Sequence, residues 1–317
     1  MPLIRLFGHA LALLLALGAA SAAQAICTTS SPSVTFTAGS SYDVQSNAIP
    51  GLSSAAGLSC SSPTLSVLGA SYAHATMTSG NGFVLSNGSD TIPYQVSPFS
   101  DGSQPFTQNG TFDYMNPAFL VLLGILNGTN FTPMIYLKLT GAPNVSAGTY
   151  SDTLTINWSW KVCNSVLAGL CVGYETGTSI STIPVKLIIG QDCRISAPDV
   201  SFGSAPLVSQ FPTVSQAVLV DCTKNSTYYV AFTSGSAGNA RPWRTMNDGA
   251  GHLLQYNLYR TDGTTIWDET NPMQSASQGA GTTTPSQPQA YKVRINPAQI
   301  TPAAGHYQDQ VSVVVSF

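Results

Sequence analysis

Short runs of alternating apolar and polar residues recur along this chain, and turn-forming Gly, Pro and Asn residues separate them. The clearest runs cover residues 148–160 and 305–317, and each begins with a glycine. An apolar residue at every second position is typical of a strand with one buried face, and no stretch shows a sustained helical period. The pattern predicts an all-β fold built from β-sandwiches of the immunoglobulin type.

An internal repeat with an offset of about 160 residues divides the chain into two halves. In the first half Cys27 is followed by the strand-like segment 33–36 and by Cys60, and in the second half Cys193 is followed by the segment 199–203 and by Cys222. Two segments that lead into an Asp-Gly turn, 94–102 and 256–263, repeat at a similar offset. The repeat predicts one sandwich over residues 26–189 and another over residues 190–317.

The first 25 residues resemble a secretory signal peptide, with Arg5, an apolar core from Leu11 to Ala20 and small residues before a cleavage site. All six cysteines follow that site, and an even number of cysteines in an exported chain indicates disulfides. Six cysteines allow fifteen connectivities, but neighbours in the sequence fall into three pairs. These pairs are Cys27 with Cys60, Cys163 with Cys171, and Cys193 with Cys222.

Charge and motifs exclude several classes of function. The chain has 11 Lys and Arg against 14 Asp and Glu, and no basic cluster, so we expect no nucleic-acid partner. No later stretch has the roughly 20 apolar residues that a membrane-spanning helix requires, so we expect no membrane insertion. No HExxH, GxSxG or phosphate-binding loop is present, so we expect no metal, no cofactor and no enzyme activity. A secreted hydrolase with paired carboxylates remains an alternative.

The two halves end differently. After the Cys163–Cys171 segment the first half continues into a further strand over residues 178–189, whereas the second half stops at Phe317. The second sandwich is therefore predicted to be incomplete, with a missing last strand that another chain must supply. Because Cys27 follows closely on the predicted cleavage site, we expect the chain to accept a strand but not to donate one. The alternatives are an internal last strand from Gln274 to Gln289, or a natural six-stranded sandwich.

The second half resembles the spore coat protein U domain family. The resemblance rests on Cys193, Asp199–Gly203, the run Val218–Thr223, Tyr256–Tyr259 with its Asp-Gly turn, and the terminal Gly-x-Tyr-x-Asp strand. Members of that family include subunits of archaic chaperone-usher pili, and two-domain members look like the tip adhesins of those pili. The resemblance implies a fimbrial (pilus) tip adhesin that is exported to the periplasm and then displayed at the cell surface, for attachment and biofilm formation. A structural coat or fibre component is the rival interpretation.

The resemblance also implies partners. These are a periplasmic chaperone, an outer-membrane usher, a neighbouring pilin subunit that donates a strand, and an abiotic or host surface. The chaperone is expected to hold the C-terminal strand, with contacts from Gln310, Val311, Val313, Val315 and Phe317.

Two apolar segments of the first half are candidate surface-binding loops. One is the run between two turn signals that contains Phe119, Leu120, Val121, Leu122, Leu123, Ile125 and Leu126. The other lies inside the Cys163–Cys171 loop and contributes Val166, Leu167 and Leu170. A buried strand is an equal alternative for the first segment, because short apolar runs do not distinguish the two. We expect a third segment, Ile49–Leu58, to lie in the core, together with the aromatic residues Trp243, Tyr256, Tyr259 and Trp267.

Overall fold

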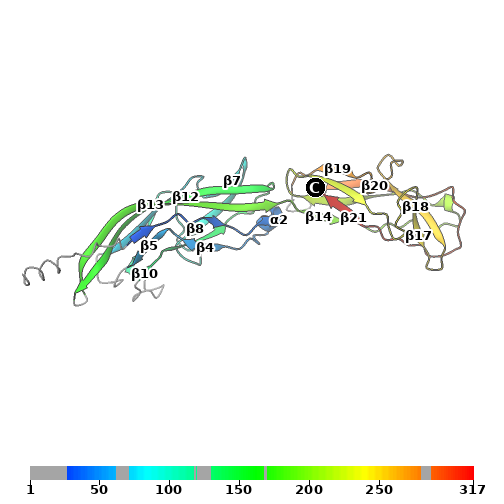
Figure 1. The fold of residues 1–317 in the computed structure, drawn as a ribbon. Coiled ribbons are helices and arrows are strands. Elements are labelled where there is room, and N and C mark those ends of the chain that lie inside the picture. The colour runs from blue at the N-terminus through cyan, green and yellow to red at the C-terminus, as the bar shows by residue number, and fades with distance from the viewer. Residues whose placement is uncertain (1–26, 62–70, 118, 120–129, 168–169, 280–286) are drawn as a thin grey trace, which may run out of the picture.

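The computed structural model describes residues 27–61, 71–117, 119, 130–167, 170–279 and 287–317. Almost all regular structure is β-strand, and the strands form four sheets, none of which combines strands from before and after Gly190. Each half of the chain thus forms its own immunoglobulin-like β-sandwich, and the two sandwiches lie end to end in an elongated molecule (Figure 1). The predicted all-β, two-sandwich fold is confirmed.

The first sandwich contains a small sheet and a large one. The small sheet has the order β1-β5-β10, and the large sheet has the order β2-β13-β12-β7-β8-β11-β4, with β3 on β13 and with β6 and β9 beside β12. Its elements are β1 (Cys27–Thr29), β2 (Val34–Thr35), β3 (Gly39–Ser40), α2 (Ser41–Gln45), β4 (Leu52–Ala55), β5 (Leu58–Ser61), β6 (Tyr72–Ser79), β7 (Val84–Asn87), β8 (Asp90–Ser97), β9 (Gly110–Asp113), β10 (Asn130–Phe131), β11 (Met134–Leu139), β12 (Gly148–Leu167) and β13 (Leu170–Gly190).

A long hairpin of β12 and β13 is the main element of the first sandwich. The two strands pair antiparallel from Gly148 opposite Ile189 to Leu167 opposite Leu170. Near Gly190, alternate residues of β13 are buried, because this part of the strand covers the core. Towards Leu170 the strand carries no fully buried side chain, and the hairpin extends to the end of the molecule that is remote from the second sandwich (Figure 1).

The second sandwich packs a sheet with the order β14-β15-β20-β18-β17 against a sheet with the order β19-β16-β21. Trp267 is fully buried between them, and its Nε1 donates a hydrogen bond of 2.7 Å to the Val230 carbonyl oxygen. The elements are β14 (Cys193–Ser196), η1 (Val208–Gln210), β15 (Val214–Cys222), β16 (Thr227–Phe232), β17 (Arg244–Asn247), β18 (Leu253–Tyr259), β19 (Met273–Ala276), β20 (Gln287–Ile295) and β21 (Val313–Ser316).

Three disulfides join the three pairs of sequence neighbours. Cys27–Cys60 links β1 to β5 and Cys193–Cys222 links β14 to β15, in both cases between directly opposite residues of antiparallel strands. Cys163–Cys171 instead clips the two strands of the long hairpin near its tip. The repeat therefore extends to the placement of a disulfide, and the third bridge belongs to the hairpin alone.

Polar contacts join the two sandwiches at a seam formed by α2, Asp90 and Ser146 of the first and residues 192–194 and 221–224 of the second. The Lys224 Nζ lies 2.5 Å from the Asp90 Oδ1, and the Tyr42 hydroxyl donates a hydrogen bond of 2.5 Å to the Asp221 carbonyl oxygen. The Arg194 guanidinium stacks 4.0 Å from the centre of the Tyr42 ring. Asp90 is buried, with 7% of its side chain exposed, so its ion pair is shielded from solvent on one side.

The seam predicts a loss of stability in acid. Burial alone would raise the pKa of Asp90, but hydrogen bonds from Lys224 and Ser146 outweigh it and hold the pKa below its ordinary value. A depressed folded-state pKa stabilises the protein above the unfolded pKa of about 3.9, and this contribution is lost as the pH falls through the folded pKa. Thermal melts between about pH 6 and 2 should therefore show a steeper decline for the wild type than for Asp90→Asn. Equal slopes would contradict the role assigned to Asp90.

Candidate functional site

The second sandwich has an open groove between two of its segments. One wall is the segment 197–203, which follows β14, and the other is the segment 305–313, which leads into β21. The groove has a volume of about 610 Å³. Its floor is formed by core side chains of both sheets, namely Phe232, Met246, Leu254, Tyr256, Leu258, Tyr291 and Val293. The groove therefore reaches down to the core of this sandwich, whose floor side chains expose only 2% to 8% of their surface.

The groove lies where each sheet has an edge. β14 is the last strand of one sheet, and β21 is the last strand of the other, since its described pairing is with β16 alone. The segment 197–203 belongs to no strand. On the opposite wall, Gln308 and Asn247 exchange two backbone hydrogen bonds of 3.0 Å, which fix that segment on the side of β17. The groove thus runs between the segment that follows β14 and the segment that leads into β21, across an apolar floor.

Apolar side chains on the walls are only partly buried. Val311, Val313 and Val315 pack against the core but remain partly exposed, as do Val200 and Phe202 on the other wall. In a complete sandwich, residues at alternate positions of a strand are sealed by a neighbouring strand. The walls of this groove have no such neighbour among the residues that the structure describes.

A polar contact holds one wall of the groove. The Tyr256 hydroxyl donates a hydrogen bond of 2.6 Å to the Asp309 Oδ2, and the Asp309 Oδ1 accepts a hydrogen bond of 2.7 Å from the Ser236 backbone nitrogen. Burial, the hydrogen bond to Asp309 and its negative charge together raise the pKa of Tyr256, which keeps the phenol protonated at neutral pH. The floor residue Tyr256 therefore positions the 305–313 wall. An apolar floor between two strand edges can accept an extended segment by β-strand addition.

The internal-strand alternative does not account for this groove. β19 pairs with β16 on the edge opposite to β21, and Gln287 to Gln289 belong to β20, between β15 and β18. The described part of the segment 274–289 therefore lies away from the groove, and residues 280–286 lie outside the described part of the chain.

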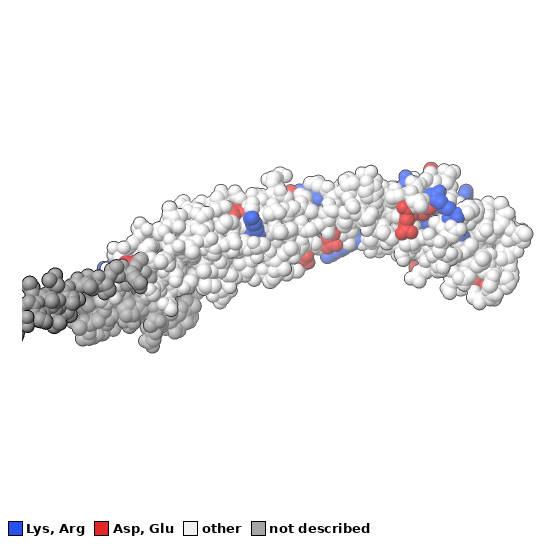
Figure 2. Space-filling model, viewed as in Figure 1, with Lys and Arg blue, Asp and Glu red and all other residues white. Residues whose placement is uncertain are grey.

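The hairpin tip of the first sandwich forms an exposed apolar surface. Leu170 and Val172 expose 65% and 62% of their surface, and Tyr174 exposes 36%. These residues occupy alternate positions of β13, so their side chains share one face. Lys161 lies over the Tyr174 ring at 4.4 Å, and Glu175 accepts a hydrogen bond of 3.3 Å from the Cys27 backbone nitrogen. Charged side chains are sparse over the visible face of the first sandwich (Figure 2).

The sequence comparison identifies the family. A family model described as the Spore Coat Protein U domain matches residues 13–157 and again residues 179–314, which together cover most of the chain. The chain belongs to the Spore Coat Protein U domain family. Both repeats match, so the first sandwich is as much a Spore Coat Protein U domain as the second. No curated protein sequence matches the chain significantly.

A solved structure shares the fold. One match is a chain from the crystal structure of the CsuC–CsuE chaperone–tip adhesion subunit pre-assembly complex of archaic chaperone-usher Csu pili from Acinetobacter baumannii. It has a TM-score of 0.59 and 20% sequence identity, and the match covers 92% of this chain and 100% of that one. A second match, from a chaperone–tip adhesin complex of CFA/I fimbriae, has a TM-score of 0.30 and 11% identity over 91% of this chain and 96% of that one, which is too low to carry an argument.

The C-terminal residues predicted to contact a chaperone lie beside the groove of this Spore Coat Protein U domain. Gln310, Val311 and Val313 line the groove. Val315 lies within β21, and Phe317 follows it with 54% of its surface exposed. The structure contains no partner chain, so the contact itself stays a prediction.

Phe119 requires a correction. It is 5% exposed, and its ring packs edge-to-face against Phe99, Phe112 and Tyr114 at 5.1 to 5.6 Å. An aromatic ring in such a cluster stabilises the core of the Spore Coat Protein U domain and is not displayed on an exposed tip. The remaining residues of that predicted loop, Leu120, Val121, Leu122, Leu123, Ile125 and Leu126, lie outside the described residues.

Burial distinguishes the other candidate residues that were expected in the core or at the hairpin tip. Ile49 and Leu58 are buried, as are Tyr256, Tyr259 and Trp267, whereas Trp243 is partly exposed. For Val166 and Leu167 the structure describes only the backbone, which pairs with Cys171 and Leu170. Val172 and Tyr174 were not predicted, although the alternation of Leu170, Val172 and Tyr174 on both sides of Cys171 is visible in the sequence. That alternation could have identified them.

Proposed function

We propose that this chain is the tip adhesin of an archaic chaperone-usher pilus. The groove of its second sandwich receives a β-strand from a periplasmic chaperone during export and from a neighbouring pilin subunit after assembly through an outer-membrane usher. Its first sandwich then attaches the cell to an abiotic or host surface and promotes biofilm formation. The observation that carries the proposal is the groove of about 610 Å³ whose floor is the domain core. Membership of the Spore Coat Protein U domain family supports it.

Strand donation fits the chemistry of the groove. An inserted strand would bury its alternate apolar side chains against Phe232, Leu258 and Tyr291, and each such side chain contributes about 1.5–3 kcal/mol. Its backbone would pair with the edges that β14 and β21 leave open, which removes a surface prone to aggregation. The predicted chaperone contacts, from Gln310 to Phe317, would lie next to that strand.

The hairpin tip fits an adhesive role. Leu170 and Val172 are exposed at the end of the first sandwich remote from the groove, so one end of the molecule can bind a surface while the other joins the fibre (Figure 1). The Cys163–Cys171 disulfide holds this part of the hairpin together. Apolar tips that repeat over many fibres add their affinities through multivalent attachment.

A coat or fibre component without an adhesive role is the second candidate, which the family description favours. The two functions differ in what they require of the hairpin, since a coat component needs no exposed apolar tip.

No helix among the residues that the structure describes is long and apolar enough to span a membrane.

Complementation of the groove by a peptide tests the assembly mechanism. We expect a peptide of about ten residues with apolar side chains at alternate positions to raise the melting temperature of the mature chain. Hydrogen exchange should slow in residues 197–203 and 305–313, because the edge amides become paired. The control peptide has the same length with aspartate at the apolar positions, and we expect it to have no effect. Unchanged exchange in both segments would contradict the proposal.

A further inference from the structure

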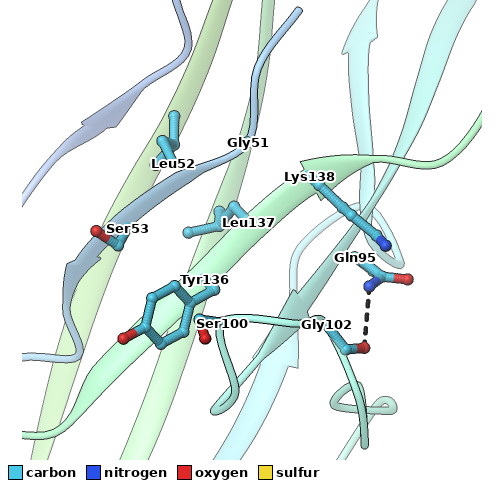
Figure 3. Close-up of a pocket in the computed structure, with 9 residues that line it drawn as sticks. All are labelled: Gly51, Leu52, Ser53, Gln95, Ser100, Gly102, Tyr136, Leu137 and Lys138. Atoms are coloured by element: carbon cyan, nitrogen blue, oxygen red, sulfur yellow. Dashed lines mark hydrogen bonds between the residues drawn. The ribbon is translucent and has the colours of Figure 1, made fainter.

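Besides the groove of the second sandwich, the molecule has a hollow on the first sandwich. It lies far from both the hairpin tip and the groove. It has a volume of about 370 Å³ and lies on the outer face of the large sheet, where β4, β11 and β8 are adjacent. A turn over residues 98–103 forms one side of it. Figure 3 shows Tyr136 beside Ser100, and Lys138 beside Gln95, with the turn running between them. Pockets of this size with a few convergent polar groups are typical of small-ligand sites.

Strand register brings the polar groups together. Tyr136 and Lys138 stand two residues apart on β11, so both side chains point away from the core. Tyr136 lies opposite Ser53 of β4, and Lys138 lies opposite Gln95 of β8. The hollow thus offers an aromatic ring, a hydroxyl, an amide and an ammonium group on a single face. Its lining combines aromatic, polar and charged groups, whereas the floor of the groove in the second sandwich is apolar.

The turn beside the hollow is preorganised. Gln95 Nε2 donates a hydrogen bond of 3.1 Å to the Gly102 carbonyl oxygen, and Ser97 Oγ donates one of 2.5 Å to the Ser103 carbonyl oxygen. Gly102 has a φ of +76°, and a Cβ atom there would lie 2.6 Å from Gln95 Nε2 and 3.2 Å from Lys138 Nζ. Glycine is therefore required both for the turn and for the space beside Lys138.

Lys138 is available for a ligand. None of the ion pairs within the described ranges involves its ammonium group. Its charge acts on Asp101, whose Oδ1 accepts a hydrogen bond of 2.8 Å from the Ser103 backbone nitrogen. Hydrogen bonds from Ser103, and to a lesser extent the charge of Lys138, lower the pKa of Asp101. Asp101 therefore interacts mainly with the turn and less with Lys138.

The repeat provides an internal comparison. Tyr94 of β8 corresponds to Tyr256 of β18, so Ser97 corresponds to Tyr259 at the same offset. Tyr259 is 5% exposed and lies under the Arg294 guanidinium at 4.9 Å, so these two large side chains fill the outer face of the second sandwich at the matching place. Ser97 is fully buried in the first sandwich, where its hydroxyl bonds the turn that lies beside the hollow.

We propose that this hollow binds a saccharide unit that carries a carboxylate. The Tyr136 ring contacts the apolar face of the sugar, Lys138 pairs with the carboxylate, and the hydroxyls of Ser53 and Ser100 hydrogen-bond to sugar hydroxyls. This site is independent of the pilus-tip function, because it uses neither the groove nor the hairpin tip.

Titration of the full mature chain with short alginate oligomers and with neutral dextran oligomers of equal length tests the proposal. We expect alginate oligomers to bind roughly tenfold more tightly than dextran oligomers, because one charge-assisted contact distinguishes them. Lys138→Gln should weaken alginate binding roughly tenfold and leave dextran binding unchanged. Tyr136→Ala should weaken the binding of both, and Tyr136→Phe should retain it.

The matched control is Lys186→Gln, which removes the same charge from an exposed position of β13 in the same sandwich. We expect it to bind alginate oligomers like the wild type. Equal losses in the two lysine variants would show general charge attraction and overturn the proposal. Equal affinity for alginate and dextran, or no binding of either at millimolar concentration, would also overturn it. Both lysines lie on the surface, so neither variant depends on repacking of the core.

Discussion

Leu170→Ser combined with Val172→Ser is expected to weaken attachment of the protein to an apolar surface by about a hundredfold per molecule. Each side chain exposes more than half of its surface at the hairpin tip, and contact with an apolar surface would remove it from water. Burial of one such side chain contributes about 2 kcal/mol, so loss of both removes at least 3 kcal/mol of binding free energy. Adsorption isotherms on polystyrene measure the effect directly.

The control for this prediction lies on the same strand. Ile180 and Ile188 share the exposed face of β13 with exposures of 60% and 49%, but they lie nearer the second sandwich. Ile180→Ser combined with Ile188→Ser removes a similar apolar area without changing the tip. Equal loss of adsorption in the two double variants would show that the whole face of β13 binds, and that the tip has no special role.

Arg244→Met is expected to destabilise the second sandwich by about 3–5 kcal/mol. Arg244 is fully buried, and its guanidinium donates to the carbonyl oxygens of Phe232, Thr233 and Trp267 and to Asn257 Oδ1. Methionine fills a similar volume but leaves these buried acceptors without their donor, and each unpaired acceptor costs about 1–3 kcal/mol. Urea unfolding of the mature chain, with hydrogen exchange followed at β17 and β18, measures the loss.

Arg294→Met is the matched control for Arg244→Met. Arg294 also belongs to the second sandwich, but it is partly exposed, and its main contact is with the Tyr259 ring. Loss of a cation–π contact costs about 0.5–1 kcal/mol, so the change in unfolding free energy should be several times smaller. Similar losses in the two variants would mean that the hydrogen bonds of Arg244 do not set the stability of this sandwich. Arg244 lies beside Met246 and Phe232 of the groove floor, so the same substitution should also weaken strand addition.

Much of the fold could be predicted from local sequence patterns. Period-two alternation predicted the strands that became β12 and β13, because a half-buried strand requires it, whereas of the strand predicted over residues 305–317 only Val313–Ser316 forms β21. The offset between Cys27–Cys60 and Cys193–Cys222 predicted two similar sandwiches, since each disulfide joins opposite residues of neighbouring strands. The incompleteness of the second sandwich stays a prediction, and the groove between the segments 197–203 and 305–313 is the feature that supports it.

The features that were missed depend on contacts between distant residues. Phe119 sits in an apolar run that reads equally well as an exposed loop or as core, and only its packing against Phe112 and Tyr114 decides between them. The pairing of Lys224 with Asp90 joins residues 134 positions apart that no motif connects. The hollow beside Lys138 depends on the register that places Lys138 opposite Gln95 and on the turn that brings Gly102 beside them, and neither follows from composition.

The continuity of β13 gives the molecule a path for mechanical load. A single strand of 21 residues runs from the apolar tip to the seam, a distance of about 70 Å at the usual rise per residue. An extended strand is already near its maximal length, so tension between the tip and the fibre that we propose would lengthen it very little. Three residues beyond Gly190 the chain reaches Cys193, whose disulfide passes the tension to Cys222 and thus into β15. A force applied at the hairpin tip would therefore be transmitted through covalent bonds into the sheet beside the groove, without first unfolding the first sandwich.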